Sequence, residues 1–98
     1  MPVFVGVCRI ELELDDNDSL KGKRSVVKSI IQKTRNKFNL AMAEVEMMDV
    51  HTRAVLGIAV IGNDKRVLNA TIDTIQNFVE REAEAPVGDF QFSIEQFD

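Results

Sequence analysis

The stretch "LAMAEVEMMDVHTRAVLGIAVIG", residues 40–62, contains two predicted strands joined by a short turn. In residues 40–48 the period of two of a β-strand places only apolar side chains on one face and both glutamates on the other. The first face has Ala41, Ala43, Val45 and Met47, and the second has Met42, Glu44 and Glu46. Residues 54–62 carry no polar side chain, as is typical of a strand buried on both faces. Residues 49–53, "DVHTR", have turn composition. The centre of the chain is therefore predicted to be a β-hairpin.

Helical periodicity is found on both sides of this hairpin. From Arg24 to Phe38, and again from Asp64 to about Glu82, apolar residues recur every three or four positions and form one stripe. Ser19 or Ser25 is expected to cap the first helix, and Asn63-Asp64 the second. Both segments are therefore predicted to be amphipathic helices that pack on a sheet.

One further strand is predicted near each end of the chain. Residues 3–14 and residues 90–97 alternate with period two. The element order is then βαββαβ, and two right-handed β-α-β units joined by a hairpin give a ferredoxin-like sandwich. We expect a single domain over residues 1–98, an α+β fold in which two helices cover one face of a four-stranded antiparallel sheet.

Charge is distributed unevenly along the chain. The net charge is −4, hydrophobic residues make up 45% and charged residues 29%, which is ordinary for a globular protein. Residues 19–43 contain seven bases and no acid, so this segment carries +7 and the remainder −11. No apolar run is long enough to span a membrane, and one cysteine allows no internal disulfide. A cytoplasmic protein is expected.

The basic segment is the first candidate site. Its cations at the start of the helix and along it could bind the phosphates of RNA or of the ribosome. The alternative is that Asp15, Asp16 and Asp18, or the acids of residues 80–84, neutralise these cations, which are then merely solvated. The candidate anion-binding residues are Lys21, Lys23, Arg24, Lys28, Lys33 and Arg35.

The sheet face opposite the helices is the second candidate site. Its predicted centre is apolar, and an apolar patch of this extent on a monomer usually marks an interface, so a symmetric homodimer packed sheet against sheet or edge against edge is expected. The alternative function is therefore a homodimeric protein-interaction module that binds no nucleic acid. No aromatic side chain is predicted on its central strands, which argues against the base stacking of an RNA-recognition motif. The second strand is expected to add Met42, Glu44 and Glu46 to this face. The candidate interface residues are Val3, Val5, Val7, Ala59 and Ile61.

Catalytic and metal-binding patterns are not found. His51 is the only histidine and Cys8 the only cysteine, so neither a metal set nor a nucleophile–base pair can be composed around them. "KGKRS" lacks the glycine frame of a phosphate-binding loop, and "DDNDSLKG" lacks the ligand spacing of an EF-hand. We predict no cofactor, no metal, no small-molecule substrate and no enzymatic activity; an enzyme or metabolite sensor with a site between subunits is the least favoured class.

Three blocks of sequence carry a family resemblance over almost the whole chain. They are "SLKGKR" at residues 19–24, Ala43-Glu44-Val45, and Asp49 with Arg53 and Gly57. In these blocks the chain resembles the small bacterial family typified by YlxP, a domain of unknown function; His51 stands where that family usually has tryptophan. The resemblance implies a ferredoxin-like fold, no established enzymatic activity and gene neighbours in transcription and translation. It favours a role associated with RNA or the ribosome.

Overall fold

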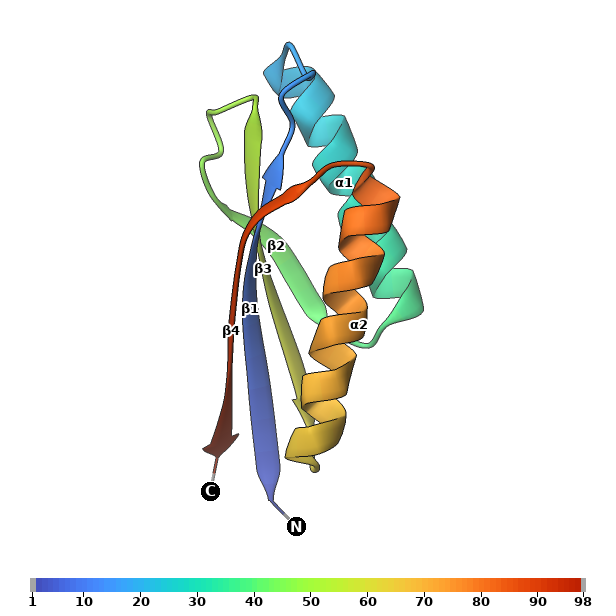
Figure 1. Cartoon of the computed structure of the whole chain (residues 1–98), viewed down its shortest axis with the longest axis vertical. Helices are drawn as coiled ribbons and strands as arrows, with labels where there is room; N and C mark the ends of the chain where they lie inside the picture. Colours follow the sequence, from blue (N-terminus) through green and yellow to red (C-terminus); the bar gives the residue numbers. More distant parts are fainter. Residues whose placement is uncertain (1, 98) are drawn as a thin grey trace.

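The computed structural model describes residues 2–97 and has the predicted element order. It consists of β1 (Val3–Glu13), α1 (Leu20–Lys37), β2 (Ala41–Glu46), β3 (Arg53–Gly62), α2 (Lys65–Ala83) and β4 (Val87–Phe97). Figure 1 shows the four long strands side by side and both helices on the same side of them.

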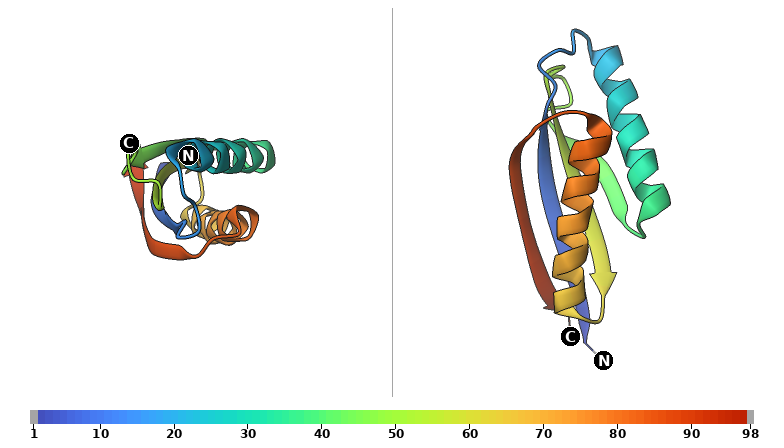
Figure 2. Two further views of the ribbon diagram at one scale, coloured as in Figure 1. Left: turned by 90° about the horizontal axis from the view of Figure 1, so that it is seen from above. Right: turned by 45° about the vertical axis from the view of Figure 1, so that its right-hand side comes forward.

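The sheet has the order β2-β3-β1-β4, and every neighbouring pair is antiparallel. The first and third strands are therefore central, and the second and fourth form the edges. Seen from above in Figure 2, the sheet and the helices form two layers, and α1 and α2 lie next to each other. This confirms the predicted ferredoxin-like βαββαβ fold.

Both helices begin at a side-chain cap. The Ser19 hydroxyl accepts a hydrogen bond from the backbone N–H of Gly22 at 3.0 Å, so α1 starts at Leu20, four residues before the predicted start. The Asp64 carboxylate accepts from the N–H groups of Arg66 and Val67, as its position before the second helix predicted. Helix α2 ends at Ala83, and the capping residue Glu84 takes the left-handed conformation common at helix ends.

The core lies between the sheet and the two helices. The inward side chains of β1 and β3 meet the apolar stripes of α1 and α2, and burial of this surface is the main favourable term for the fold. The residues at its centre are Cys8, Ile10, Leu12, Ile30, Leu56, Ile58, Ile72, Ile75 and Val79. The predicted alternation of β1 is confirmed, because its even-numbered residues from Cys8 to Leu14 are buried.

The faces of β2 differ from the prediction. Ala41 pairs with Ala59 and Glu44 with Leu56, so Met42 and Glu44 point towards the helices, while Ala41 and Ala43 lie on the open face. The residues of an antiparallel pair share a face, which is why pairing with β3 decides the orientation. A β-bulge between Glu44 and Glu46 then returns Glu46 to the open face, as predicted.

Candidate nucleic-acid interface

Helix α1 carries a stripe of exposed cations. At 100° per residue, Lys21, Arg24, Lys28 and Arg35 fall within an arc of about 60°, and at 1.5 Å per residue they span about 21 Å. All four are exposed. We call these four residues the basic stripe. Lys33 is also exposed but lies on the opposite flank, where Lys37 sits over the ring of Phe78 from α2.

The cations of the basic stripe are not neutralised by the acids next to them in sequence. Among residues 2–97, no carboxylate lies within ion-pair distance of Lys21, Arg24, Lys28, Lys33 or Arg35. Asp15 pairs with Arg53 instead, at 2.8 Å. The acids that end α2 are also used locally, because Glu80 accepts from the backbone of Val87 and Glu82 pairs with Arg81.

Between the two flanks of α1, the outward surface is polar and uncharged. A shallow hollow is lined by four uncharged polar side chains and by Lys28 and Lys33 on its two sides. Hydroxyl and amide groups, like charged ones, donate hydrogen bonds to phosphate and sugar oxygens. The uncharged residues are Ser25, Ser29, Gln32 and Asn36. The whole outer surface of this helix is thus free of acids.

Lys23 does not belong to this surface, which corrects the prediction that it contacts phosphate. Its side chain is fully buried, and its Nζ lies 2.8 Å from Glu44 Oε2 in an ion pair whose alignment falls short of a hydrogen bond. The same ammonium donates to the carbonyls of Met47 at 2.7 Å and Arg53 at 3.2 Å. Its charge is therefore compensated by groups of the same chain and is not available to a phosphate.

The burial of Lys23 carried a signal in the sequence. Once α1 is extended back to Leu20, Lys23 precedes Val27 by four positions and Ile30 by seven, so it shares their buried stripe. Its partner Glu44 was assigned to the wrong face of β2, which concealed the pair. Glu44, and not an aspartate of residues 15–18, is what compensates a cation at the start of α1.

The start of α1 is also tied to the β2–β3 turn. Asn17 donates through Nδ2 to the carbonyl of Ser19 at 2.7 Å and to that of His51 at 2.6 Å. Leu14 donates its N–H to the carbonyl of Thr52. Together with Lys23, these bonds hold the first turn of the basic stripe against the hairpin.

The open face of the sheet divides into two halves along its strands. In the half towards the end of β1, Arg9 pairs with Glu46 and Asp89 from the two edge strands, and Arg53 pairs with Glu11 and Asp15. The hydrogen bond from Arg9 lowers the pKa of Glu46, and that carboxylate raises the pKa of Arg9. Both guanidinium groups are occupied, so this charged half offers no free cation to a polyanion.

The other half of the open face is apolar, and it contains all five predicted interface residues. Val5 is opposite Ile61 and Val7 is opposite Ala59, so these side chains project together with Val3. Ala41, which pairs with Ala59, and Phe97, which pairs with Val3, extend the same surface. Ile61 is 67% exposed and Phe97 73%. We call these seven residues the apolar half; that it is an interface stays a prediction.

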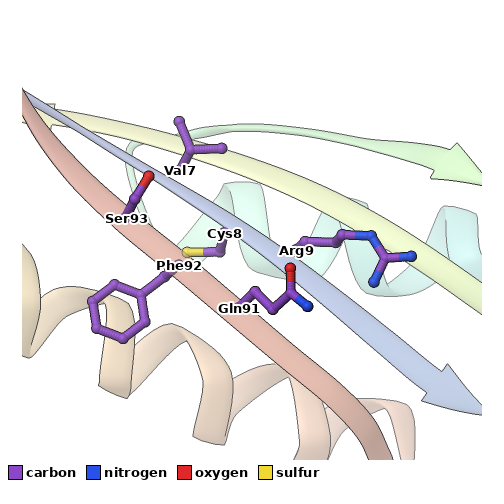
Figure 3. A pocket seen from close by; sticks show the side chains of 6 residues that line it. All are labelled: Val7, Cys8, Arg9, Gln91, Phe92 and Ser93. Atoms are coloured by element: carbon purple, nitrogen blue, oxygen red, sulfur yellow. The ribbon is translucent and has the colours of Figure 1, made fainter.

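A shallow hollow runs between β1 and β4 where the two halves meet (Figure 3). Val7 and Ser93 project to one side of these strands, and Phe92 projects to the side of the helices. Arg9 borders the hollow but is engaged by Glu46 and Asp89. Although it lies on the helix side, Phe92 is 43% exposed, because β4 is an edge strand.

The remaining candidate residues have structural surroundings. Burial raises the pKa of the Cys8 thiol to about 11, which makes it an inert core residue at neutral pH. His51 is exposed in the hairpin turn. Within residues 2–97, no three His, Cys, Asp or Glu side chains are grouped so that they could hold a metal ion. Neither helix of that range is long and apolar enough to cross a membrane.

These features define a ferredoxin-like α+β domain with one basic helix and one open, half-apolar sheet face. The chain belongs to the family described as a protein of unknown function (DUF503), whose model matches residues 5–92. It is similar to the "Uncharacterized protein YlxP" of Bacillus subtilis (strain 168), with 29% identity over 77 residues that cover 79% of this chain and 84% of YlxP. The resemblance read from "SLKGKR" and the hairpin is thereby confirmed.

Solved structures agree on the fold. A de novo designed protein with ferredoxin fold, LFR1 1, has a TM-score of 0.52 at 15% identity, covering 95% of this chain and 83% of its own. The de novo designed Foldit4 has a TM-score of 0.53 at 10% identity, covering 98% and 97%. Bacillus subtilis YxeP, a dinuclear metal binding peptidase from the M20 family, has a TM-score of 0.55 at 16% identity; the match covers 97% of this chain but 26% of YxeP. At these identities the likenesses show the fold alone.

Proposed function

We propose that this protein is a non-enzymatic, cytoplasmic RNA-binding protein that contacts the phosphates of structured RNA, such as ribosomal RNA, through α1. The observation that carries the proposal is that the four cations of the basic stripe, with Lys33 on the other flank, are exposed and unpaired within residues 2–97. Exposed cations in a row attract a phosphate backbone and release its counterions, which supplies most of the affinity of sequence-independent binding.

The chemistry of the same surface favours duplex RNA over a single strand. Single-strand binders stack bases on aromatic side chains, and residues 20–37 contain none. The hydroxyl and amide groups between the flanks of α1 suit the phosphates and 2′-hydroxyls displayed by an RNA helix. We therefore expect recognition of shape and backbone, with little preference for sequence.

A fluorescence anisotropy titration tests this proposal. The probe is a labelled RNA duplex of about 16 base pairs, the length that a double-stranded RNA-binding domain spans. With four phosphate contacts, the logarithm of the binding constant should fall with the logarithm of salt concentration with a slope of about −3.6. A single-stranded oligonucleotide of the same length should bind more weakly. The absence of salt-sensitive binding to the duplex at low ionic strength would overturn the proposal.

Two charge-reversal variants make the test specific. Arg24→Glu with Lys28→Glu removes two cations of the basic stripe and should weaken duplex binding about tenfold or more, with a slope shallower by about 1.8. Lys65→Glu with Arg66→Glu changes the net charge equally, at exposed cations of α2, and should change binding by less than about threefold. Equal losses in the two variants would show that only net charge matters, and would contradict an interface on α1.

A further inference from the structure

We infer that the apolar half of the open face is the contact surface of a homodimer, in which two copies pack sheet against sheet. The apolar half, defined above, lies on the side of the sheet that no helix covers (Figure 1). Its large side chains Val3, Val7, Ile61 and Phe97 are all exposed. Soluble monomers seldom leave such side chains contiguous and uncovered.

The distribution of charge on the open face favours a second copy of the chain as the partner that covers the apolar half. In a two-fold symmetric contact each surface meets its own copy, so a surface with one sign of charge repels itself and an apolar surface does not. The charged half holds Arg9 and Arg53 against the carboxylates of Glu11, Asp15, Glu46 and Asp89, so it is net negative. Two copies can therefore overlap at the apolar half only, with the charged halves projecting at opposite ends.

The register of the strands gives the arrangement. A two-fold axis that crosses the strands at Val5 brings Val5 and Ile61 onto their own copies and places Val3 opposite the partner's Val7. The two sheets then stack about 10 Å apart with their strands within about 30° of antiparallel. Glu95, which pairs with Val5 from edge strand β4, lies at the rim facing its own copy. The only charge within the overlap is thus at its solvated margin.

The area of the contact predicts a reversible dimer. Three strands about 4.8 Å apart, with five residues at about 3.3 Å each, give roughly 240 Å² of flat surface per copy. Protruding side chains such as Ile61 and Phe97 raise the total buried area of the two copies to roughly 500–900 Å². This is below the roughly 1,200 Å² of stable specific interfaces and in the range of weak, transient ones, so we expect dissociation in the high micromolar range.

Sedimentation velocity of the full chain across low to high micromolar concentrations tests the inference. The wild type should shift from monomer to dimer within this range. Ile61→Lys places a charge next to its own copy and should leave the protein monomeric throughout, whereas Val67→Lys should dimerise like the wild type. Val67 is a matched control, because it is 61% exposed but lies on α2, away from the sheet face. Circular dichroism confirms that both variants fold.

A third variant tests whether each surface meets its own copy, as the two-fold arrangement requires. Glu95→Gln removes the carboxylate that faces its own copy, so dimerisation should tighten by about twofold or more at low salt, and the gain should shrink as salt is added. A wild type that stays monomeric at the highest concentration, or an Ile61→Lys variant that dimerises normally, overturns the inference. A dimer that Glu95→Gln leaves unchanged at low salt overturns the proposed two-fold arrangement. None of these outcomes depends on RNA binding by α1.

Discussion

The buried ammonium of Lys23 gives the sharpest test of how the basic helix is built. Its Nζ serves Glu44 and the carbonyls of Met47 and Arg53, so replacement by methionine, which has a similar length, removes the donor and leaves three acceptors behind. Removal of one partner of a buried ion pair costs about 3–5 kcal/mol. The Glu44 side chain keeps 17% of its surface exposed, so its orphaned charge is partly solvated and the lower end of this range applies.

We therefore expect Lys23→Met to lower the free energy of unfolding by about 3 kcal/mol, a large part of the total for a domain of this size. Urea denaturation followed by circular dichroism should show the midpoint falling by about 1–3 M, and the melting temperature should fall by about 12 °C or more. Lys21→Met is the matched control, because Lys21 is exposed and unpaired on the same turn; it should change stability by less than about 0.5 kcal/mol.

A double variant separates the ion pair from simple loss of packing. If Glu44→Leu is combined with Lys23→Met, no charge is left uncompensated, so the double variant should be more stable than the sum of the single losses predicts. A loss of less than about 1 kcal/mol in Lys23→Met would refute the reasoning. In that case the ammonium would be reached by solvent, and Lys23 would rejoin the cations that are available to phosphate.

Two further predictions concern the open face of the sheet. Because the hydrogen bond from Arg9 lowers the pKa of Glu46 below its usual value of 4.5, their pair stabilises the fold above that pH and is lost as the pH falls through the folded-state pKa. Glu46→Gln should therefore be less stable than the wild type at neutral pH and equally stable in acid, measured by urea denaturation; a difference that persists in acid would contradict this. A Cβ on Gly57 would lie 2.9 Å from Val45 Cγ1, so Gly57→Ala should cost about 1–3 kcal/mol and the added change Val45→Ala should restore most of it. Wild-type stability of Gly57→Ala would contradict this contact.

The fold could be predicted from the sequence because its periodic signals agree with one another. In β1 the inward residues are apolar and the outward ones turn charged from Arg9 onwards, so only one register buries the apolar set. The apolar stripes of the helices are long enough that an error of one turn in the start of α1 does not change the predicted topology. Local periodicity, caps and short connections therefore all lead to the same topology.

Strand β2 shows where such reasoning fails. Its residues alternate between small apolar side chains and glutamate or methionine, and a glutamate is ordinarily assigned to the solvated face. In the structure Glu44 points inward, because Lys23 reaches it from a helix that lies twenty residues earlier in the chain. Neither the bulge after Glu44 nor this pair can be read from the strand alone, since both depend on contacts distant in sequence.

The candidate cations could be identified from the sequence by counting bases. Which of them are exposed and able to bind phosphate could not be predicted in this way. The charge of +7 in residues 19–43 does not show which of these side chains pair with other groups of the chain. The structure assigns Lys23 to Glu44 and Lys37 to the ring of Phe78, and it leaves the basic stripe and Lys33 exposed. The aspartates of residues 15–18, which offered the simplest alternative, do not pair with these cations within residues 2–97.

A net charge of −4 is compatible with a polyanion-binding helix because the charges of the two faces act over different distances. At physiological salt the Debye length is about 8 Å, which is shorter than the 18–21 Å of the molecule's two smaller dimensions. A phosphate beside α1 therefore senses the adjacent cations, while the acids of the charged half across the sheet are screened. At about 0.01 M salt the Debye length of about 30 Å exceeds those dimensions, so the acids then oppose binding as well. The physiological range is thus where the basic stripe, and not the net charge, decides the affinity.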